Sequence, residues 1–419
     1  MPGRVLMIAY HYPPVHGSSG LLRTLKFSRY LPEHGWHADV LSAHARAYER
    51  MNPDSLRDIP EGVHVTRAFA LDTARHLALA GRYWSRLALP DRWVSWLVGG
   101  VCSGLLDIRK RRPDVLYSTY PIATAHLIGY VLHRLTGLPW VADFRDPMAQ
   151  DGYPSDPARW RAYARIERLA ITHAARCVFV TPGALALYRE RYPEIPPERF
   201  VLVANGYDEE DFAGISAPPR PAGRPITLVH SGVIYPSERD PRPFFEALAA
   251  LVRAQALGPE QLRIVLRATG HDNLYRPQLE ALGIADLVEL APPVPYRTAL
   301  EEMLGADGLL LFQASNCNQQ IPAKAYEYLR AGRPVLALTD AAGDTAGLLC
   351  DAGLTSIVPL DDAQAIATGL LSFLERVRSG RESLPPPEVR AAYSRAARSA
   401  DLARVLETVL HETRRRGHP

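Results

Sequence analysis

Short apolar runs recur along the chain, each followed by a longer helical pattern, and this alternation constrains the fold more than any other feature. The first series of runs covers residues 5–10, 38–42, 63–69, 115–119, 140–143, 177–181 and 201–204. The second series covers residues 226–230, 264–268, 288–290, 308–312, 334–338 and 356–359. Strands that alternate with helices are typical of parallel sheets in α/β proteins. The sequence therefore predicts two doubly wound parallel sheets in tandem.

A proline-rich stretch separates the two series. Residues 217–225 read Ala-Pro-Pro-Arg-Pro-Ala-Gly-Arg-Pro, which cannot continue a helix. The length of 419 residues, with 47% hydrophobic content, is sufficient for two large domains. We predict these parts: an N-terminal Rossmann-like domain (1–207), a linker (208–225), a C-terminal Rossmann-like domain (226–385) and a helical segment (386–419) that crosses back to the first domain.

Charge, cysteines and hydropathy argue against several classes of function. The formal net charge is only +3, so we expect no nucleic-acid partner. The four cysteines form no Cys-x-x-Cys pair, which argues against a zinc site or a disulfide scaffold. Residues 5–9 read as a strand rather than a signal peptide, and the apolar stretch 93–106 is shorter than the ~20 residues that span a bilayer. We expect a cytoplasmic protein without a transmembrane helix.

The stretch Gln-Gln-Ile-Pro-Ala-Lys-Ala-Tyr-Glu-Tyr-Leu at residues 319–329 is a candidate anion site. It places Lys324 near the start of a helix that follows a strand. The first helical turn leaves backbone N–H groups unpaired and carries a partial positive charge, so it favours a phosphate. Lysine is rare in this arginine-rich chain, which makes Lys324 suggestive. A surface lysine on an ordinary amphipathic helix is the alternative interpretation.

The loop after the first apolar run is a second candidate site. In open parallel sheets, ligands collect at the carboxyl ends of the strands. Gly17 and Gly20 permit close backbone approach in this loop. Ser18 or Ser19 can cap the following helix, which carries Arg23. A flexible turn with a helix cap is the alternative interpretation.

Two further strand ends carry charged side chains. Asp143, Arg145 and Asp146 follow one strand pattern, where a structural ion-pair network is the alternative to a functional site. In the second series, Arg239 comes shortly after a strand and can face the same anion as Lys324. Two such cations can stabilise charge that develops on a leaving diphosphate. We expect no metal site, because no Asp-x-Asp pair stands at a strand end.

Taken in order, these motifs resemble those of the retaining nucleotide-sugar glycosyltransferases of family 4. The matching stretches are the Pro-Pro-x-x-Gly loop with Arg23, and residues 143–146, 205–208, 230–232 and 324–337. The resemblance spans essentially the whole chain and implies the α/β GT-B fold, with two facing Rossmann-like domains and a C-terminal helix that returns to the first. It implies donor-binding roles for Gly17, Ser18, Ser19, Gly20, Arg23, Ser231, Gly232, Gln319, Ile321, Pro322, Ala323 and Glu327. It implies catalytic roles for Arg239, Lys324, Asp143 and Arg145, the first two of which would hold the diphosphate.

Two positions depart from the family pattern. In the family, a Glu-x7-Glu motif contacts the donor, the first acid facing the sugar and the second binding the ribose. Here Glu327 is the second acid, whereas Gln319 stands at the first position and brings no charge. Arg145 stands where many relatives have a histidine. Both departures are similar to a subfamily with Asp-x-Arg-Asp and Ile-Pro-x-Lys motifs, found among enzymes of bacterial surface polysaccharide assembly.

The resemblance implies transfer of a sugar, with retention and without a cofactor, from a UDP- or GDP-linked co-substrate to a lipid-linked or small-molecule hydroxyl acceptor. The departing phosphate would take the acceptor proton, and Asp143 is the alternative base. Two other classes stay open: a nucleotide-sugar epimerase or hydrolase on the same fold, and a non-catalytic nucleotide-sugar binding subunit, which the uncharged Gln319 suggests.

Trp84, Trp93 and Trp96, with the basic cluster at residues 109–112, allow two interpretations. A helix here can lie on an anionic membrane and meet a lipid-linked acceptor, which would make the protein peripheral on the inner face of the membrane. Alternatively, the helix packs in the core with a solvated basic end. We favour the core helix because three glycines weaken an isolated helix.

Overall fold

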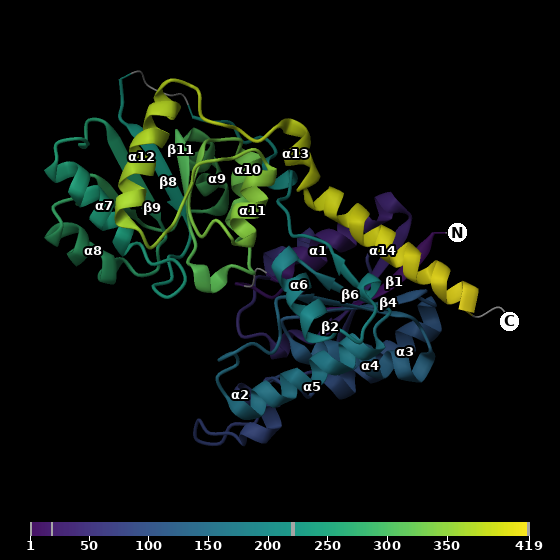
Figure 1. The fold of residues 1–419 in the computed structure, drawn as a ribbon. Coiled ribbons are helices and arrows are strands. Elements are labelled where there is room, and N and C mark those ends of the chain that lie inside the picture. Colours follow the sequence, from purple (N-terminus) through teal and green to yellow (C-terminus); the bar gives the residue numbers. More distant parts are fainter. Residues whose placement is uncertain (1, 18–19, 219–222, 417–419) are drawn as a thin grey trace. The chain divides into compact units, whose positions relative to one another are not determined.

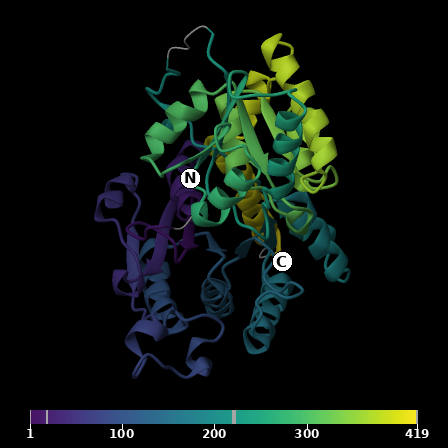
Figure 2. The same ribbon diagram turned by 90° about the vertical axis from the view of Figure 1, so that its left-hand side faces the viewer.

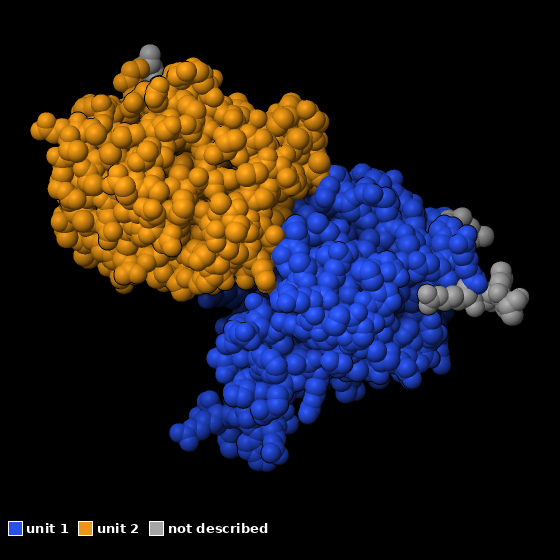
Figure 3. Space-filling view, in the orientation of Figure 1, with its two compact units in different colours: residues 1–205, 395–419 blue, residues 206–394 orange. Residues whose placement is uncertain are grey.

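The computed structural model describes residues 2–17, 20–218 and 223–416. Contacts divide the chain into two compact units, which are coloured separately in Figure 3. Unit 1 comprises the described parts of residues 1–205 and 395–419, and unit 2 comprises those of 206–394. Each unit is built around one parallel sheet, as the two series of strand patterns predict. The residues of the predicted linker that are described belong to unit 2.

Among the described residues, unit 1 has a seven-stranded sheet in the order β3-β2-β1-β4-β5-β6-β7. Its strands are β1 (Gly3–Ile8), β2 (Trp36–Ala43), β3 (Val65–Ala68), β4 (Val115–Thr119), β5 (Trp140–Arg145), β6 (Arg176–Phe179) and β7 (Phe200–Leu202). Every pairing is parallel. The strand order reverses between β1 and β4, and ligands of such sheets bind at the carboxyl ends beside this switch point.

Helices cover both faces of this sheet (Figure 1). One face packs against α1 (Gly20–Tyr30) and α14 (Arg395–Arg416). The other packs against α3 (Trp96–Arg111), α4 (Ala123–Thr136), α5 (Pro157–His173) and α6 (Pro182–Arg191). Successive side chains of a strand point to opposite faces, so Val5 and Met7 join the first layer while Leu6 and Ile8 join the second. The predicted return of the C-terminal helix to the first domain is confirmed, because α14 packs on α1.

Unit 2 repeats this architecture with a six-stranded parallel sheet among its described residues, in the order β10-β9-β8-β11-β12-β13. Its strands are β8 (Ile226–Ser231), β9 (Leu262–Arg267), β10 (Val288–Ala291), β11 (Gly308–Phe312), β12 (Val335–Leu338) and β13 (Ile357–Val358). One face packs against α7 (Arg242–Arg253), α8 (Asp272–Ala281) and α12 (Ala363–Arg378). The other packs against α9 (Tyr296–Gly305), α10 (Ala323–Ala331), α11 (Asp344–Asp351) and α13 (Pro387–Ala392).

Helix α3 is a core helix, the interpretation favoured for it above. Trp96 in its first turn is fully buried. Gly100 and Gly104 allow close packing on α4, since an added Cβ would lie 2.5 Å from Ile128 or 2.7 Å from Leu132. Across the described residues, no helix combines the length and the apolar character needed to cross a bilayer.

Candidate functional site

The first turn of α10 in unit 2 carries the predicted cation. The helix starts at Ala323, directly after Pro322, and no side chain of the described residues caps it. The Lys324 ammonium lies 2.6 Å from Oε2 of Glu327 and 5.7 Å from the ring centre of Tyr296. The Tyr296 hydroxyl donates a 3.0 Å hydrogen bond to Oε1 of Glu327. This helix start therefore combines backbone N–H groups, a half-buried ammonium and a carboxylate held within its reach.

The end of β8 lies next to the Lys324 side chain. Gly232 has φ 142°, and its missing Cβ would lie 3.8 Å from the Cε atom of Lys324. The N–H of Ser231 donates to the hydroxyl of Tyr328 at 3.4 Å, and that hydroxyl donates to the carbonyl of Leu310. Because a side chain at position 232 would be strained at this φ, glycine leaves the strand end open to the Lys324 side chain.

Arg239 lies in the loop between β8 and α7. Its Nη1 donates a 2.6 Å hydrogen bond to the carbonyl of Val233, and its guanidinium carbon is 5.4 Å from the ring centre of Tyr235. Within the described residues, no carboxylate lies within ion-pair distance of this guanidinium. Its charge is therefore held in place by a carbonyl and an aromatic face without being neutralised.

His230, near the end of β8, is buried next to this site. Its Nδ1–H donates to the carbonyl of Leu310 at 2.9 Å, because a carbonyl only accepts. The pKa of His230 is lowered to about 4, mainly by burial, with smaller contributions in the same direction from the charges of Arg239 and Lys324. Arg239 donates to the carbonyl of Val233, and the Lys324 side chain lies beside Gly232, so both cations lie next to the residues that follow β8.

The remaining predicted donor-binding residues of unit 2 form the loop before α10. Gln319 and Ala323 are exposed, and Ile321 and Pro322 are half-buried. Gln313, which no sequence motif indicated, stabilises this loop. Its amide donates 2.8 Å hydrogen bonds to the carbonyls of residues 317 and 320. Its position could have indicated this role, because Gln313 is a polar residue directly after the apolar strand that leads into the loop.

In unit 1, Arg23 and Asp143 form a buried ion pair. Two nitrogens of Arg23 each donate a 3.0 Å hydrogen bond to Asp143, and the guanidinium also donates to the backbone of residues 203 and 204 and the side chain of Asn205. Tyr117 and Thr119 donate to the same carboxylate. Burial by itself would raise the pKa of Asp143, but the Arg23 charge and these hydrogen bonds outweigh it and lower the pKa. The pair ties α1 to β5 and the chain after β7.

Arg145 and Asp146 follow at the end of β5, where the strand bulges away from β6. Arg145 has φ 60°, an uncommon conformation for a residue with a side chain, which often marks functional sites. Burial raises the pKa of Asp146, partly opposed by the Arg145 charge. Burial lowers the pKa of His11 to about 4, and Arg145 contributes in the same direction. Because β1 and β5 are parallel strands of one sheet, His11, Arg145 and Asp146 lie along the same carboxyl edge, and they are called the edge cluster here.

No sequence motif indicated a role for His11, although this residue follows the first strand, where ligands of such sheets collect. Of the predicted loop residues nearby, Gly17 is exposed with φ 80°, and Gly20 is the first residue of α1. Ser18 and Ser19 lie outside the described residues.

Comparison with known proteins agrees with this architecture. Residues 22–206 match a family model described as a glycosyl transferase 4-like domain. A search of curated proteins found no match. Similar solved structures include a glycosyltransferase from Rickettsia africae, with 12% identity, coverage of 98% of this chain and 99% of that one, and a TM-score of 0.67.

Two further similar structures are sucrose-phosphate synthase from Thermosynechococcus elongatus and HepE from Anabaena, the latter in complex with UDP and glucose. The first has 14% identity and a TM-score of 0.61, the second 13% and 0.59, and each covers 99% of this chain and 98% of its own. At these identities the likeness concerns the fold. The chain therefore has the GT-B fold, and its residues 22–206 match a glycosyl transferase 4-like domain.

Proposed function

We propose that this protein is a glycosyltransferase that moves a sugar from a nucleotide-diphosphate donor to a hydroxyl acceptor with retention. One observation carries the proposal: Arg239, bound to the carbonyl of Val233, and Lys324, beside Gly232 in the first turn of α10, both lie at the carboxyl end of β8. Two cations and a helix start are together suited to a diphosphate rather than to a single carboxylate. The match of residues 22–206 and the fold of the similar structures support the same class of reaction.

In this proposal Glu327 binds the ribose of the donor. Its carboxylate is held by Lys324 and Tyr296, so its position is set before a ligand arrives. A ribose hydroxyl can donate to the carboxylate while a phosphate oxygen accepts from the ammonium. The Lys324–Glu327 ion pair would thus contact both parts of the nucleotide, with Ser231, Gly232 and the loop from Gln319 to Ala323 beside the phosphates and the sugar.

The proposed chemistry breaks the bond between the anomeric carbon and the phosphate oxygen and forms a bond to the acceptor oxygen on the same face. Negative charge develops on the leaving diphosphate, which Arg239 and Lys324 stabilise. The leaving phosphate oxygen takes the acceptor proton, and two cations do the work assigned to a metal in other enzymes. We assign Asp143 a positioning role through Arg23, because its carboxylate is fully buried and engaged by hydrogen bonds. Arg145 and Asp146 are the better placed groups for the acceptor.

Thermal unfolding of the full chain with single ligands tests the donor site. UDP, GDP and their sugar conjugates bind the folded state alone, so at least one should raise the melting temperature, whereas adenosine should not. The same ligand should lose its effect in Arg239→Ala and Lys324→Ala. If no nucleoside diphosphate or nucleotide sugar raises the melting temperature of the wild type, the proposal fails.

A non-catalytic binding subunit is the second candidate, because Gln319 brings no charge to the sugar position. Product analysis separates the candidates. Transfer to an acceptor supports the glycosyltransferase, donor consumption without an acceptor supports the hydrolase or epimerase alternative, and binding without turnover supports the binding subunit.

A further inference from the structure

A segment between β3 and α3 projects from the body of unit 1. This segment, residues 73–89, is called the projection below. It contains the short helix α2 (Thr73–His76) and a turn of 3-10 helix at Ser85–Ala88. Figures 1 and 2 show it extending beyond the helices that cover the sheet, next to the label α2 in the first view. The space-filling view shows the same end of unit 1 as a narrow extension (Figure 3).

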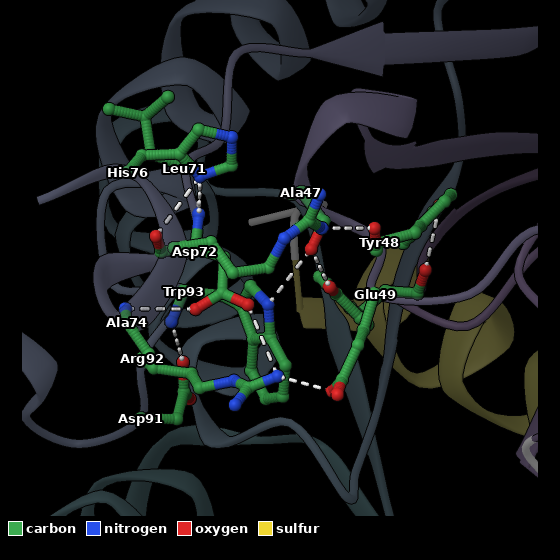
Figure 4. Close-up of polar contacts among 12 residues, drawn as sticks. Ala47, Tyr48, Glu49, Leu71, Asp72, Ala74, His76, Asp91, Arg92 and Trp93 are labelled. Carbon is green, nitrogen blue, oxygen red and sulfur yellow. Dashed lines mark hydrogen bonds and ion pairs between the residues drawn. The ribbon is translucent and has the colours of Figure 1, made fainter. Parts of the chain in front are cut away.

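Both ends of the projection are fixed to unit 1 by a polar network (Figure 4). Arg92 pairs with Asp72 at 3.1 Å and with Glu49 at 2.7 Å, and so joins the two ends of the segment to the loop after β2. Asp72 also caps α2 by accepting from the N–H of Ala74. The indole N–H of Trp93 donates to the carbonyl of Ala47. Ion pairs and hydrogen bonds therefore hold both ends of the projection in a defined position on unit 1.

The tip of the projection is a tight turn. The backbones of Leu79 and Arg82 exchange hydrogen bonds of 2.8 and 3.0 Å. The two residues between them, Ala80 and Gly81, have φ 51° and 75°, as a type I′ turn requires. Nearer the base, the Thr73 hydroxyl donates to the carbonyl of Leu87, which links the two arms. The backbone of the tip is thus defined by its own hydrogen bonds.

Large apolar side chains cover this ordered tip. Leu79 is 86% exposed and Trp84 is 81% exposed, and Leu77, Tyr83 and Leu87 are exposed as well. Single exposed apolar residues are common, but a cluster of this kind on one protruding element marks an interaction surface.

The charges of the projection are all of one sign. Arg75, Arg82 and Arg86 lie within it, and residues 73–89 contain no aspartate or glutamate. Arginine beside exposed tryptophan and leucine matches an anionic lipid surface, because the rings and aliphatic chains enter the interface while the guanidinium groups meet the phosphates. The amphipathic ring of Trp84 favours the interfacial region of a bilayer, between the headgroups and the acyl chains.

We propose that the projection docks unit 1 onto an anionic lipid bilayer. It starts just after β3, at the carboxyl edge of the sheet, which is also the edge of the cluster formed by His11, Arg145 and Asp146. The ring of Trp93, at its base, lies 4.7 Å from that of Tyr10, the neighbour of His11. Resting on the proposed function, this placement selects a lipid-linked acceptor, whose hydroxyl group reaches the cluster from the membrane surface.

Co-sedimentation of the full chain with lipid vesicles tests the docking. The wild type should bind vesicles of equal parts phosphatidylglycerol and phosphatidylcholine, and bind pure phosphatidylcholine far more weakly. The double variant Leu79→Glu/Trp84→Glu should lower the partition coefficient at least about tenfold, because it removes two apolar side chains from the interface. Arg82→Gln/Arg86→Gln should remove most of the preference for anionic lipid.

A matched control replaces exposed leucines at the opposite edge of the sheet. Leu106 and Leu135 lie near the ends of α3 and α4 that lead into strands, and are 55% and 61% exposed. Leu106→Glu/Leu135→Glu should bind vesicles like the wild type. The proposal is overturned if the wild type does not bind anionic vesicles. It is also overturned if Leu79→Glu/Trp84→Glu binds them as well as Leu106→Glu/Leu135→Glu does. A self-association that only Leu79→Glu/Trp84→Glu abolishes, without vesicle binding, would identify a second copy as the occupant and overturn it too.

This readout is independent of the proposed function. Leu79→Glu/Trp84→Glu should keep the full thermal shift with nucleoside diphosphate, since the donor groups lie in unit 2. Vesicle binding without any nucleotide effect would leave the docking standing and remove the proposed transfer.

Discussion

Arg23 in unit 1 and Arg239 in unit 2 are both cations at the carboxyl edge of a parallel sheet, yet their surroundings differ. Arg23 is 3% exposed and donates to a buried carboxylate and to backbone carbonyls. Arg239 is half-buried and donates to one carbonyl, and Lys324 beside it pairs with a carboxylate that remains partly exposed. The resemblance to family 4 implies that all three cations lie in the donor site.

This difference teaches that the partner and its burial decide what a cation does. A cation saturated by a buried acid stabilises the fold, because removing it leaves the acid unpaired. A cation held by carbonyls and rings keeps its charge available for a ligand. Substitutions in the two units should therefore differ in effect: those in unit 1 should lower stability, and those in unit 2 should lower ligand binding and transfer.

The largest effect is expected when Arg23 is removed. Arg23→Met leaves Asp143 buried without its cation and should destabilise unit 1 by about 3–5 kcal/mol. All six tryptophans of the chain lie in residues 1–205, so tryptophan fluorescence in urea follows unit 1. Arg57→Met, at the exposed pair with Asp54, is the control and should leave the transition unchanged. A stable Arg23→Met protein would show that the pair does not hold unit 1 together.

Each unit also holds a buried neutral histidine, His126 in unit 1 and His230 in unit 2. Burial lowers the pKa of each to about 4, from an ordinary value of 6.5. The unfolded chain therefore takes up protons below about pH 6.5, whereas the folded chain does so only near pH 4, so acid favours unfolding. Each histidine should lower the free energy of unfolding by on the order of 3 kcal/mol as the pH falls from about 6.5 to about 4.

His126→Gln isolates this contribution in unit 1. The stability followed by tryptophan fluorescence should fall less steeply between pH 6.5 and pH 4.5 in the variant than in the wild type. His230→Gln should leave the pH dependence of this transition as it is. Equal slopes in wild type and His126→Gln would mean that this imidazole is not the group that titrates.

In unit 2, Arg239→Ala and Lys324→Ala should each lower kcat/KM for sugar transfer about 100-fold or more, because both stabilise the leaving diphosphate. Neither should change the tryptophan transition of unit 1. Arg242→Ala is the matched control, since Arg242 is three residues from Arg239 but exposed and paired with Asp240. Wild-type turnover in both alanine variants would refute the assigned role.

The smallest effect concerns Glu327. Glu327→Ala should weaken UDP or GDP binding about tenfold, because a hydrogen bond from the ribose to a carboxylate is lost. Binding of inorganic pyrophosphate, which has no ribose, should not weaken. Calorimetry measures the affinity for both ligands. An equal loss of affinity for the nucleotide and for pyrophosphate would mean that Glu327 acts at the phosphates instead.

Local patterns predicted the fold well, for physical reasons. Each predicted strand of both series has a counterpart in the structure, because buried parallel strands are continuous apolar runs that the sequence displays directly. Lys324 likewise lies in the first turn of α10, since a proline before a helical pattern marks a helix start.

The partners of the charged groups could not be predicted in this way. Arg23 and Asp143 are 120 residues apart, and their pairing depends on how α1 packs over β5. The strained backbone of Arg145 and the burial of His11 also depend on the packed sheet. The exposure of individual side chains could not be predicted either. Of the three tryptophans between residues 84 and 96, Trp96 is buried and Trp84 is exposed.

The placement of α14 has a consequence for how the protein is made. Unit 1 is formed by two separate stretches of the chain, and unit 2 is inserted between them. The side of the first sheet that carries Val5 and Met7 is covered in part by Leu402, Leu406 and Val409 of α14. On the ribosome, unit 2 is therefore synthesised before α14 can complete this cover, so unit 1 reaches its full packing only after unit 2 has emerged.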